Sequence, residues 1–355
     1  GGMSRNGAGI MTAAVLHGRE DVKVERVPIP KLSNGEVLVK VAVALTCGTD
    51  LKVFRRGYHA RMIKPPALFG HELAGEIVEA APGVENFKPG MRVVAANSAP
   101  CGACFYCRRG QENLCDDLLF NNGAYAEYIR IPRRIVQKNL VSIPEHVSFS
   151  AAAMVEPLAC VLLGAKETGI SDGDTIAIIG AGPIGLMFIQ VAKAKGARVI
   201  TVVRRNEQAA IARRFGADEI VVLSETPDVP AAVRELTESG RGPDVVIEAV
   251  GKPEAWQQAI AMVRKGGTVN FFGGCASGTK VELDTHRIHY SGLRMLATFH
   301  HTPAAIRESL ALIAQDKVRS LDYITGQAPL ADLVSVLRQM MEPNANIKTA
   351  IIPGS

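Results

Sequence analysis

Apolar and polar residues alternate in short runs through the first 150 residues of this chain. The runs "DVKVERVPIP", "EVLVKVAVALTCG", "AGEIVEAAPG" and "MRVVAAN" are separated by Pro, Gly and Asn. Alternation with a period of two, interrupted by turn residues at close intervals, is typical of short, half-buried strands. We therefore expect the N-terminal part to form an all-β, barrel-like unit.

The pattern changes near residue 150. "SFSAAAMVEPLACVLLGAKETG" is rich in alanine and predicts a helix. Short runs that are apolar throughout follow it: "DTIAIIG", "ARVITVV", "EIVVL", "PDVVIEAVG" and "GGTVNFFGG". Helical stretches separate most of them, which indicates a parallel sheet covered on both faces. From "HTPAAIRESLALIAQDKVRS" onward the pattern predicts two helices and a final short strand, "KTAIIP".

Length and composition suit a globular protein of about two domains. The chain has 355 residues, 47% of them hydrophobic and 21% charged, with a formal net charge of +5. This charge is small for the length and the basic residues are scattered, so we expect no nucleic-acid partner. No apolar run reaches the roughly 18 residues of a membrane span, and we see no signal peptide before the first strand. We therefore expect a cytoplasmic protein without a membrane partner.

Four of the seven cysteines lie close together in "CGACFYCRRGQENLC". Their spacing is C-x2-C-x2-C-x7-C, formed by Cys101, Cys104, Cys107 and Cys115. In a large cytosolic chain such a cluster binds metal more often than it forms disulfides. Four thiolates leave no open coordination position, which favours a structural zinc site. An iron–sulfur cluster and four unrelated thiols are the alternatives.

"TIAIIGAGPIGLMFIQVAKAKGA" combines a strand, the loop G-A-G-P-I-G and a helix. Gly180 permits a tight turn, Gly182 lets the backbone approach a pyrophosphate, and Gly185 allows close helix–sheet packing. The helix N-terminus adds N–H donors. The stretch therefore predicts dinucleotide binding. We expect four further residues to contact the dinucleotide: Pro183, Ile184, Val250 and Phe272.

The end of the second strand of this unit distinguishes NAD from NADP. An NAD site usually has Asp or Glu there, about 20 residues beyond the glycines, to bind the ribose 2′-hydroxyl. Val203 stands at this position and is followed by Arg204 and Arg205. Two guanidinium groups without a carboxylate suit a 2′-phosphate, so we expect NAD or NADP and favour NADP. A solvated charged pair and stacking of the arginines on adenine are the alternatives.

A cysteine, a histidine and a carboxylate are spread through the N-terminal half. They are Cys47 in "LTCGTD", His71 in "FGHELAG" and Glu156 in "MVEPLAC". Three such ligands could hold a zinc ion and leave its fourth position open for substrate. Each of these residues has a common structural explanation by itself, however, and composition alone does not show that the three lie close together.

Taken together, these motifs resemble the zinc-dependent medium-chain dehydrogenase/reductase family, nearest its sorbitol and threonine dehydrogenase branch. C-G-T-D, G-H-E, the four-cysteine lobe, E-P and G-A-G-P-I-G occur in the family's order over nearly the whole chain. The resemblance implies an α/β fold in which a Rossmann doubly wound parallel sheet domain is inserted into a β-rich GroES-like catalytic domain. The implied bounds are 10–156 for the catalytic domain with its zinc lobe at 98–118, 157–295 for the Rossmann domain, and 296–355 for a C-terminal segment that returns to the catalytic domain.

The resemblance also implies roles for individual residues. Cys47, His71 and Glu156 match the ligands of a catalytic zinc, and Glu72 matches a carboxylate near the metal that can exchange onto it. Thr49 matches the hydroxyl that relays the substrate proton. The lobe cysteines match a structural zinc site, which makes two zinc ions per chain.

Two positions depart from the family's pattern. Lys52 stands where many members have a histidine that passes the proton outward. "ATFHHTP" has His300 and His301 where polyol dehydrogenases often have an Arg–aromatic pair, which makes His300 a candidate substrate contact. These departures leave the proton route and the identity of the alcohol open.

The implied activity is reversible hydride transfer between a secondary alcohol, or its carbonyl product, and NAD or NADP. Polyols, sugar derivatives and amino alcohols all fit as substrates. A homodimer or homotetramer is expected by resemblance. The alternatives are a zinc-stabilised binding protein that keeps the fold without catalysis, and a zinc-module nucleic-acid binder, for which Arg108 and Arg109 are thin support.

Overall fold

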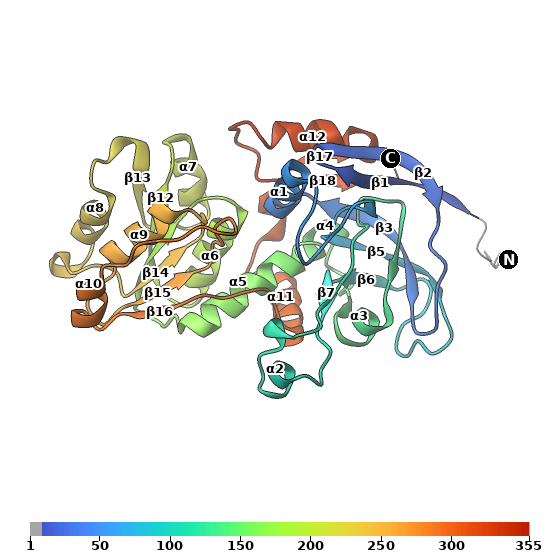
Figure 1. The fold of residues 1–355 in the computed structure, drawn as a ribbon, viewed down its shortest axis with the longest axis horizontal. Helices are drawn as coiled ribbons and strands as arrows, with labels where there is room; N and C mark the ends of the chain where they lie inside the picture. Colours follow the sequence, from blue (N-terminus) through green and yellow to red (C-terminus); the bar gives the residue numbers. More distant parts are fainter. Residues whose placement is uncertain (1–8, 355) are drawn as a thin grey trace. The chain divides into compact units, whose positions relative to one another are not determined.

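The computed structural model describes residues 9–354, which divide into two compact units (Figure 1). The first unit ends at Glu156 and resumes with the C-terminal segment from His301. The second unit comprises Pro157–His300. Each unit has its own sheet system and its own cluster of buried apolar side chains.

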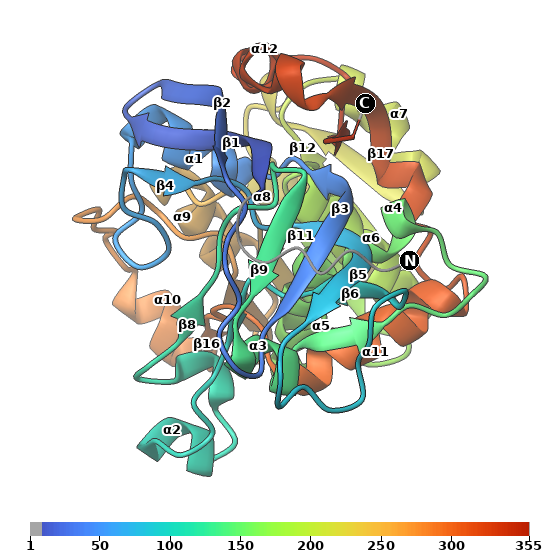
Figure 2. The same ribbon diagram turned by 90° about the vertical axis from the view of Figure 1, so that its right-hand side faces the viewer.

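Strands dominate the first unit, as the alternating pattern predicts (Figure 2). Strand β1 pairs with β2 and β4, and β7 pairs with β8. A seven-stranded sheet has the order β10-β6-β5-β3-β18-β17, with β9 paired to β3. The bounds are β1 Ile10–Gly18, β2 Asp21–Pro28, β3 Val37–Leu45, β4 Ala67–Leu68, β5 Leu73–Ala80, β6 Arg92–Ala95, β7 Ser98–Ala99, β8 Leu119–Phe120, β9 Tyr128–Ile131, β10 Leu140–Ser142, β17 Ile324–Pro329 and β18 Lys348–Ile352.

Short helices connect these strands. Helix α1 begins after Cys47, whose sulfur accepts the Thr49 N–H, and it ends at Gly57, which has a φ of 87°. The helices of the first unit are α1 Gly48–Arg56, α2 Phe105–Arg108, α3 Arg133–Lys138, α4 Phe149–Ala152, α11 Pro303–Ala314 and α12 Leu333–Gln339, with 3-10 turns at Glu112–Leu114, Ser320–Tyr323 and Leu330–Asp332.

The position of β3 between β5 and β18 determines which segments meet. Ala44 of β3 pairs antiparallel with Leu73 of β5, and Leu45 pairs antiparallel with Ala350 of β18. The residues that follow β3 therefore lie at the same edge of the sheet as the residues at the start of β5 and β18. This register brings three segments that are far apart in the sequence to one place.

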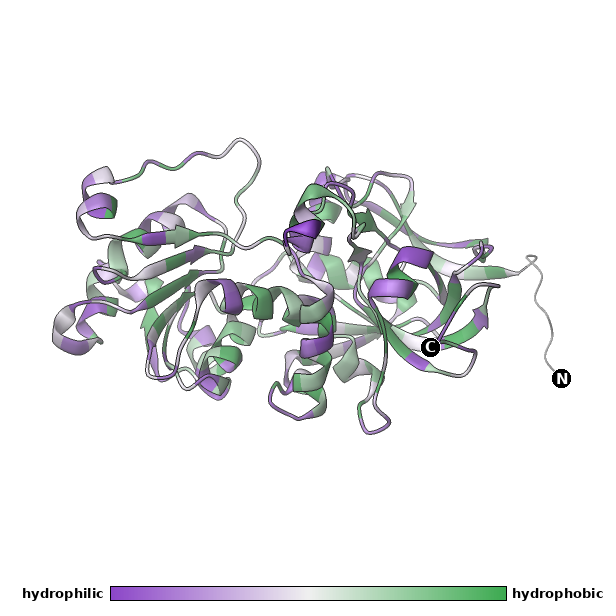
Figure 3. Ribbon diagram, turned by 90° about the horizontal axis from the view of Figure 1, so that it is seen from below, coloured by the Kyte–Doolittle hydropathy of each residue, from purple (hydrophilic) through white to green (hydrophobic). Residues whose placement is uncertain are grey.

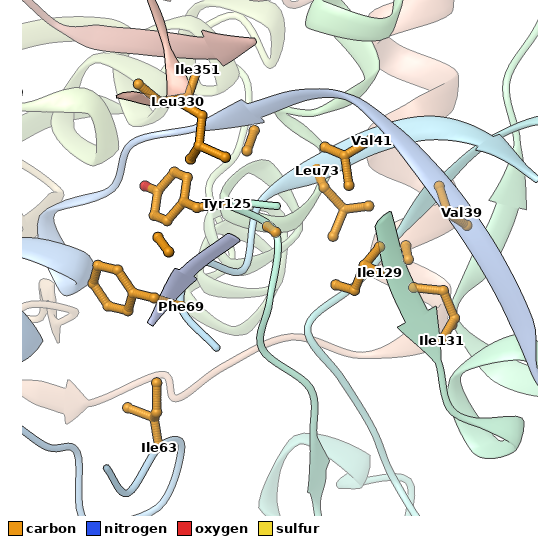
Figure 4. Close-up of a cluster of buried hydrophobic side chains, with 14 of the residues drawn as sticks. Val39, Val41, Ile63, Phe69, Leu73, Tyr125, Ile129, Ile131, Leu330 and Ile351 are labelled. Atoms are coloured by element: carbon orange, nitrogen blue, oxygen red, sulfur yellow. The ribbon is translucent and has the colours of Figure 1, made fainter. Parts of the chain in front are cut away.

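The C-terminal segment also contributes to the buried core of the first unit. Leu330 and Ile351 belong to the same apolar cluster as Leu73 and Tyr125 (Figure 4). Tyr125 is fully buried, and its ring centroid lies 5.5 Å from that of Phe69. Burial of these side chains stabilises the association of the C-terminal segment with the N-terminal strands.

The second unit is a parallel sheet with the order β13-β12-β11-β14-β15-β16. Numbered along the unit this is 3-2-1-4-5-6, the doubly wound Rossmann order, so the predicted fold class is confirmed. The bounds are β11 Thr175–Ile179, β12 Arg198–Val203, β13 Glu219–Val222, β14 Val245–Glu248, β15 Thr268–Phe271, β16 Arg294–Leu296, α5 Val155–Thr168, α6 Pro183–Ala194, α7 Glu207–Arg214, α8 Val229–Glu235, α9 Pro253–Met262 and α10 Thr285–Tyr290, with 3-10 turns at Leu223–Glu225 and Glu238–Gly240.

The strands of this sheet are apolar along most of their length (Figure 3). Ile176, Ala177, Ile178 and Ile179 of β11, for example, are all buried. A strand in the middle of a doubly wound sheet has helices over both faces, so neither face needs polar side chains. This explains the continuous apolar runs in the sequence.

Within residues 9–354, one helical stretch is long and apolar enough to cross a membrane, Phe149–Thr168, which spans α4 and α5. Most of its apolar window, 72%, is buried inside the protein. A core helix has the same length and composition, so this stretch is weak evidence for a membrane contact.

Candidate active site

Cys47, His71 and Glu72 bring one sulfur, one imidazole and one carboxylate together at the edge of the seven-stranded sheet. Their candidate ligand atoms all lie within 4.8 Å of one another. Cys47 follows β3, whereas His71 and Glu72 directly precede β5, and the pairing of these two strands explains the convergence. Sulfur, nitrogen and carboxylate oxygen are the donors that zinc binds in proteins, so these residues fit a zinc ion.

Asp50 orients the His71 ring. Its Oδ1 lies 3.0 Å from His71 Nδ1, and its Oδ2 accepts a hydrogen bond from the Tyr125 hydroxyl at 2.5 Å. With Nδ1 donating to the carboxylate, Nε2 is the nitrogen left for a metal ion, and it lies 3.8 Å from Glu72 Oε2. Metal-binding histidines are commonly held in this way. Sequence reasoning missed Asp50, although it is the last residue of the C-G-T-D motif.

The charge state of His71 follows from the same contacts. Burial by itself would lower the pKa of His71, but the Asp50 carboxylate and, to a lesser extent, the Cys47 thiol more than offset it. The pKa of His71 therefore lies well above its ordinary value in the absence of a metal. The negative charge of Asp50 and Cys47 stabilises the protonated His71 ring. The same charge would stabilise a metal cation bound to the ring after it has lost its proton.

Lys348 contributes a buried ammonium group to the same edge. Its Nζ lies 2.9 Å from Glu72 Oε1 and 3.2 Å from Oε2, and it donates to the Thr46 carbonyl oxygen at 2.9 Å. Both charged side chains are almost completely inaccessible to solvent. Burial would lower the pKa of Lys348, but Glu72, Cys47 and Glu156 raise it above its ordinary value. Lys348 was also missed, since nothing in the local sequence "NIKTAIIP" marks it.

Glu156 lies in a different group of donor atoms from Cys47 and His71. Its Oε1 is 3.8 Å from His301 Nε2, which lies 2.9 Å from Asn97 Oδ1. The charge of Glu156 nevertheless reaches Lys348, because it helps to raise the pKa of that ammonium. The ligand set Cys47, His71 and Glu156 stays a prediction, and the sequence named His301 only beside His300 in "ATFHHTP", without a role.

Three further residues were singled out from the sequence. Thr49 is half-buried in the first turn of α1, and its N–H donates to Cys47 Sγ at 3.4 Å. Lys52 is exposed one turn further along the same helix. His300 is the last residue of the second unit, with a φ of 67° and its ring stacked on Phe299 at 5.3 Å. The roles of Thr49 in proton relay and of His300 in substrate contact stay predictions.

The four lobe cysteines form a second compact group of donors. The sulfur atoms of Cys101, Cys104, Cys107 and Cys115 all lie within 4.8 Å of one another. A tetrahedral zinc site with Zn–S bonds of about 2.3 Å has sulfur–sulfur separations of about 3.8 Å, so this arrangement fits zinc. Backbone N–H groups also point at the sulfurs: Cys101 accepts from Ala103 and Cys104, and Cys115 accepts from Cys101 and Asp117.

The lobe thiols have very different proton affinities in the absence of metal. The N–H groups of Cys107 and Asp116 lower the pKa of the Cys104 thiol to about 6. Burial and the neighbouring thiols raise the pKa of Cys107 to about 12. Crowded thiolates oppose one another's ionisation, and a divalent cation at their centre would remove this conflict.

The glycine loop of the second unit has the geometry that its sequence requires. Gly180 has a φ of 114°, which L side chains rarely adopt. A Cβ atom added at Gly185 would come within 2.1 Å of the Gly180 carbonyl oxygen, so only glycine fits there. Gly182 faces open space and precedes α6, which has Pro183 in its first turn. An anion at this helix N-terminus meets unpaired N–H groups.

Arg204 and Arg205 are exposed directly after β12, at the carboxyl edge of the sheet. Their backbone N–H groups donate to Gln208 Oε1, at 3.0 and 3.3 Å, which fixes the backbone of this turn. Sequence reasoning did not identify Gln208. The guanidinium groups therefore project from an ordered turn at the place where a dinucleotide ribose binds in this fold.

Val250 and Phe272 differ in their surroundings. Val250 is exposed, and a Cβ atom at Gly180 would lie 3.1 Å from its Cγ2, so it borders the glycine loop. The ring of Phe272 instead packs edge-to-face on Phe188 of α6, with centroids 4.8 Å apart. Their predicted contacts with the dinucleotide, like those of Ile184, stay predictions.

The known proteins to which this chain is similar are dehydrogenases. Residues 33–145 match the model described as the alcohol dehydrogenase GroES-like domain, and residues 183–315 match the zinc-binding dehydrogenase model. Sorbitol dehydrogenase of Bacillus subtilis (strain 168) is 31% identical over 351 residues, 97% of each chain. L-threonine 3-dehydrogenase of Pyrococcus abyssi (strain GE5 / Orsay) is 38% identical over 277 residues, 76% of this chain and 77% of the relative.

Among solved structures, a similar one is a protein from Sinorhizobium meliloti 1021, described as a zinc-binding dehydrogenase bound to NADP. It is 32% identical, and the similarity covers 98% of this chain and 100% of that one, with a TM-score of 0.89. The similarity in fold and sequence thus extends over both units.

Proposed function

Since this chain belongs to the zinc-dependent alcohol dehydrogenase family and is an NAD(P)-dependent alcohol or polyol dehydrogenase, we propose that it holds two zinc ions, with the catalytic one at Cys47 and His71. The observation that carries this proposal is the convergence of Cys47, His71 and Glu72 within 4.8 Å, with His71 oriented by Asp50. The second zinc is assigned to the four lobe cysteines, whose closed set of sulfurs suits a structural role.

The third protein ligand of the catalytic zinc is proposed to be Glu156. Both carboxylate oxygens of Glu72 face the Lys348 ammonium, so the charge of Glu72 is balanced without a metal. The Glu156 charge also raises the pKa of Lys348, but less than Glu72 does, and Glu156 Oε1 lies 3.8 Å from His301 Nε2. Under this proposal Glu72 would be a replacement ligand for the metal.

The residues of the site then divide the chemistry among them. Zinc bound there supplies a Lewis acid that lowers the pKa of the alcohol hydroxyl and favours loss of its proton near neutral pH. Asp50 keeps the His71 tautomer that leaves Nε2 unprotonated, and Tyr125 keeps Asp50 in place. Thr49 is proposed to take the substrate proton and pass it outward, and the glycine loop orients the cofactor for hydride transfer.

The cofactor is proposed to be NADP in preference to NAD. Val203 leaves the ribose side of the site without a carboxylate, and Arg204 and Arg205 place two cations next to it. A solved relative is bound to NADP, which supports the same choice. The preference rests on the charge of these two side chains, so it is open to direct measurement.

The substrate class is proposed to be a secondary alcohol with a further hydroxyl or amino group. Relatives named for sorbitol and for L-threonine support this class, because both compounds carry such a group beside the reacting carbon. A homodimer or homotetramer in the cytoplasm completes the proposal. A reducing compartment keeps the lobe cysteines available as thiolates.

Purified protein should be assayed on a panel of polyols, sugar derivatives, amino alcohols and simple secondary alcohols, each with NAD and with NADP. Elemental analysis of the same preparation should give two zinc ions per chain, and light scattering its oligomeric state. Turnover of a vicinal diol or amino alcohol by a two-zinc protein is the expected result. Two zinc ions with no turnover of any alcohol would favour the non-catalytic binding protein instead.

A further inference from the structure

Glu248 is a completely buried carboxyl group that the zinc chemistry does not use. It is the last residue of β14, and its side chain is inaccessible to solvent. Its Oε1 accepts hydrogen bonds from the N–H groups of Val250 and Gly251, at 2.8 and 2.7 Å. Glu248 therefore fixes the turn formed by residues 249–251 through two buried hydrogen bonds.

The second oxygen of Glu248 lies among glycines. A Cβ atom added at Gly273 would lie 2.9 Å from Glu248 Oε2 and 2.4 Å from the nitrogen of Gly251, so no larger residue fits there. Oε2 is buried and, within residues 9–354, accepts no hydrogen bond of normal geometry. The nearby N–H groups of Gly273 and Trp256 donate instead to the carbonyl oxygens of Glu248 and Gly273, at 2.8 and 3.0 Å.

Burying a carboxylate lowers the free energy of unfolding unless the group is hydrogen-bonded, paired with a cation or protonated. Burial raises the pKa of Glu248, although the N–H groups of Gly251, Val250 and Gly273 and the Trp256 indole oppose the increase. An apolar residue would fill the same space without this cost, but it could not accept the two N–H bonds of the turn. Glu248 therefore acts on the conformation of the turn, by accepting these two hydrogen bonds.

The turn borders the glycine loop. Ala249 N–H donates to the Ile179 carbonyl oxygen at 2.9 Å, and a Cβ atom at Gly180 would lie 3.1 Å from Val250 Cγ2 and 3.4 Å from the Ala249 oxygen. Strands β11 and β14 are neighbours at the point where the strand order reverses. In doubly wound sheets the ligand lies in the crevice outside the carboxyl ends of the strands at this point. The turn at 249–251 is thus one side of that crevice.

The order of the strands indicates which half of the dinucleotide the turn meets. In this fold the adenosine ribose binds at the end of the second strand, here β12, and the pyrophosphate binds at the glycine loop after β11. Strand β14 lies on the opposite side of β11 from β12. The nicotinamide half of the dinucleotide must therefore extend toward the turn that Glu248 holds.

We propose that Glu248 is a positioning residue for the nicotinamide half of the cofactor. The N–H groups of Val250 and Gly251 point toward the buried Glu248 carboxyl group. The exposed Val250 side chain and the carbonyl groups of the turn therefore point toward the crevice. The inference rests on the use of a nicotinamide dinucleotide, and binding of NADPH or NADH to the wild-type protein tests that premise separately.

The test compares Glu248→Asp with Glu248→Gln. Aspartate is one methylene shorter and cannot reach both N–H groups, whereas glutamine keeps an acceptor oxygen at the same reach. Calorimetry should measure the Kd of NADPH and NADH, which span both halves of the cofactor, and of ADP and 2′,5′-ADP, which carry only the adenosine half. Both substitutions are small, so both variants should fold, and melting temperatures check this.

In Glu248→Asp the affinity for NADPH and NADH should fall about tenfold while the affinity for ADP and 2′,5′-ADP stays within twofold, because one of the two N–H hydrogen bonds that fix the turn is lost. Glu248→Gln should bind all four nucleotides like the wild type. The matched control is Asp244→Asn, which precedes the same strand at the opposite edge of the sheet. There the carboxylate accepts from Thr175 N–H at 2.7 Å and from Arg264 Nε at 2.6 Å.

Asp244→Asn should lower the melting temperature and leave the affinity for every nucleotide unchanged. Equal losses for the adenosine fragments and the whole cofactor in Glu248→Asp would overturn the proposal, as would wild-type binding of NADPH and NADH by that variant. Failure of the wild-type protein to bind NADPH and NADH would instead contradict the use of the cofactor itself.

Discussion

Lys348 and Glu72 form a buried ion pair between residues 276 positions apart in the chain, with Nζ 2.9 Å from Oε1. The pair joins β18, the last strand, to the segment before β5 that carries His71. Because Lys348 also donates to the Thr46 carbonyl oxygen, it contacts the residue next to Cys47 as well. One ammonium thus connects the C-terminal segment to the two chain segments that carry Cys47 and His71.

Replacing Lys348 with methionine should destabilise the protein severely. The change leaves the Glu72 carboxylate buried without its cation, and breaking one side of a buried pair costs about 3–5 kcal/mol of the free energy of unfolding. Chemical denaturation at fixed zinc concentration measures the loss. Lys40→Met, at an exposed position of β3, should change the free energy of unfolding by less than about 0.5 kcal/mol.

The double variant Lys348→Met/Glu72→Gln provides a check on this cause. It removes the stranded charge, so it should be more stable than Lys348→Met alone. A double variant that is less stable than the single one would show that packing of the lysine side chain, and not the unpaired carboxylate, is responsible.

Replacing Cys104 with serine should remove one zinc ion per chain and lower the melting temperature. Backbone N–H groups lower the pKa of the Cys104 thiol to about 6, so it is a strong thiolate ligand near neutral pH. Elemental analysis and thermal denaturation measure the two effects. Cys275→Ser, at a half-buried cysteine of the second unit, should keep both zinc ions. Unchanged zinc content in Cys104→Ser would contradict the lobe assignment.

Glu156→Ala should reduce kcat by at least about a hundredfold while the Kd of NADPH changes little. The carboxylate is proposed to hold the metal that polarises the alcohol, and the cofactor binds at the glycine loop of the other unit. Steady-state kinetics and fluorescence titration separate these effects. Glu145→Ala, at an exposed position before α4, is the control and should be fully active. Normal turnover by Glu156→Ala would transfer the ligand role to Glu72.

Arg204→Ala should weaken the preference for NADP. A charge-assisted bond to a phosphate contributes roughly 1.5–3 kcal/mol, so wild-type kcat/KM should favour NADP about tenfold or more, and the variant should lose most of this ratio. Arg213→Ala, exposed on α7, should leave the ratio unchanged. Equal loss of kcat/KM with both cofactors in Arg204→Ala would indicate stacking on the adenine ring.

The buried Glu248 should make stability depend on pH in a defined direction. Burial raises its pKa in the folded protein above the ordinary value of 4.5. An acid with a raised folded pKa contributes its full stability below its unfolded pKa and loses it as the pH rises through the folded pKa. The free energy of unfolding of Glu248→Gln relative to the wild type should therefore increase as the pH rises above about 4.5, with a slope of at most about 1.4 kcal/mol per pH unit.

Denaturation of both proteins across this pH range measures the difference, in which effects of zinc binding common to both cancel. A difference that is constant with pH, or that decreases, would show that Glu248 has no raised pKa in the folded protein.

The local sequence pattern by itself determined the parallel sheet, the glycine loop and the cysteine lobe of this protein. The continuous apolar runs after residue 150 predicted a parallel sheet, because strands covered on both faces need no polar side chains, and the structure has that sheet in the Rossmann order. The glycine loop was also predictable, since a positive φ at Gly180 and the close approach at Gly185 are requirements on single residues. The lobe cysteines come from one short loop, so their spacing alone predicted that their sulfurs would converge.

Other features depended on strand pairing between distant segments, which local pattern does not encode. The antiparallel register of β3 with β5 and β18 placed Asp50 beside His71 and Lys348 beside Glu72. It also grouped Glu72, and not Glu156, with Cys47 and His71. The charges of Asp50, Lys348 and Glu248 are ordinary in the sequence. Only the tertiary structure, by burying each of them against particular partners, decided which groups they contact.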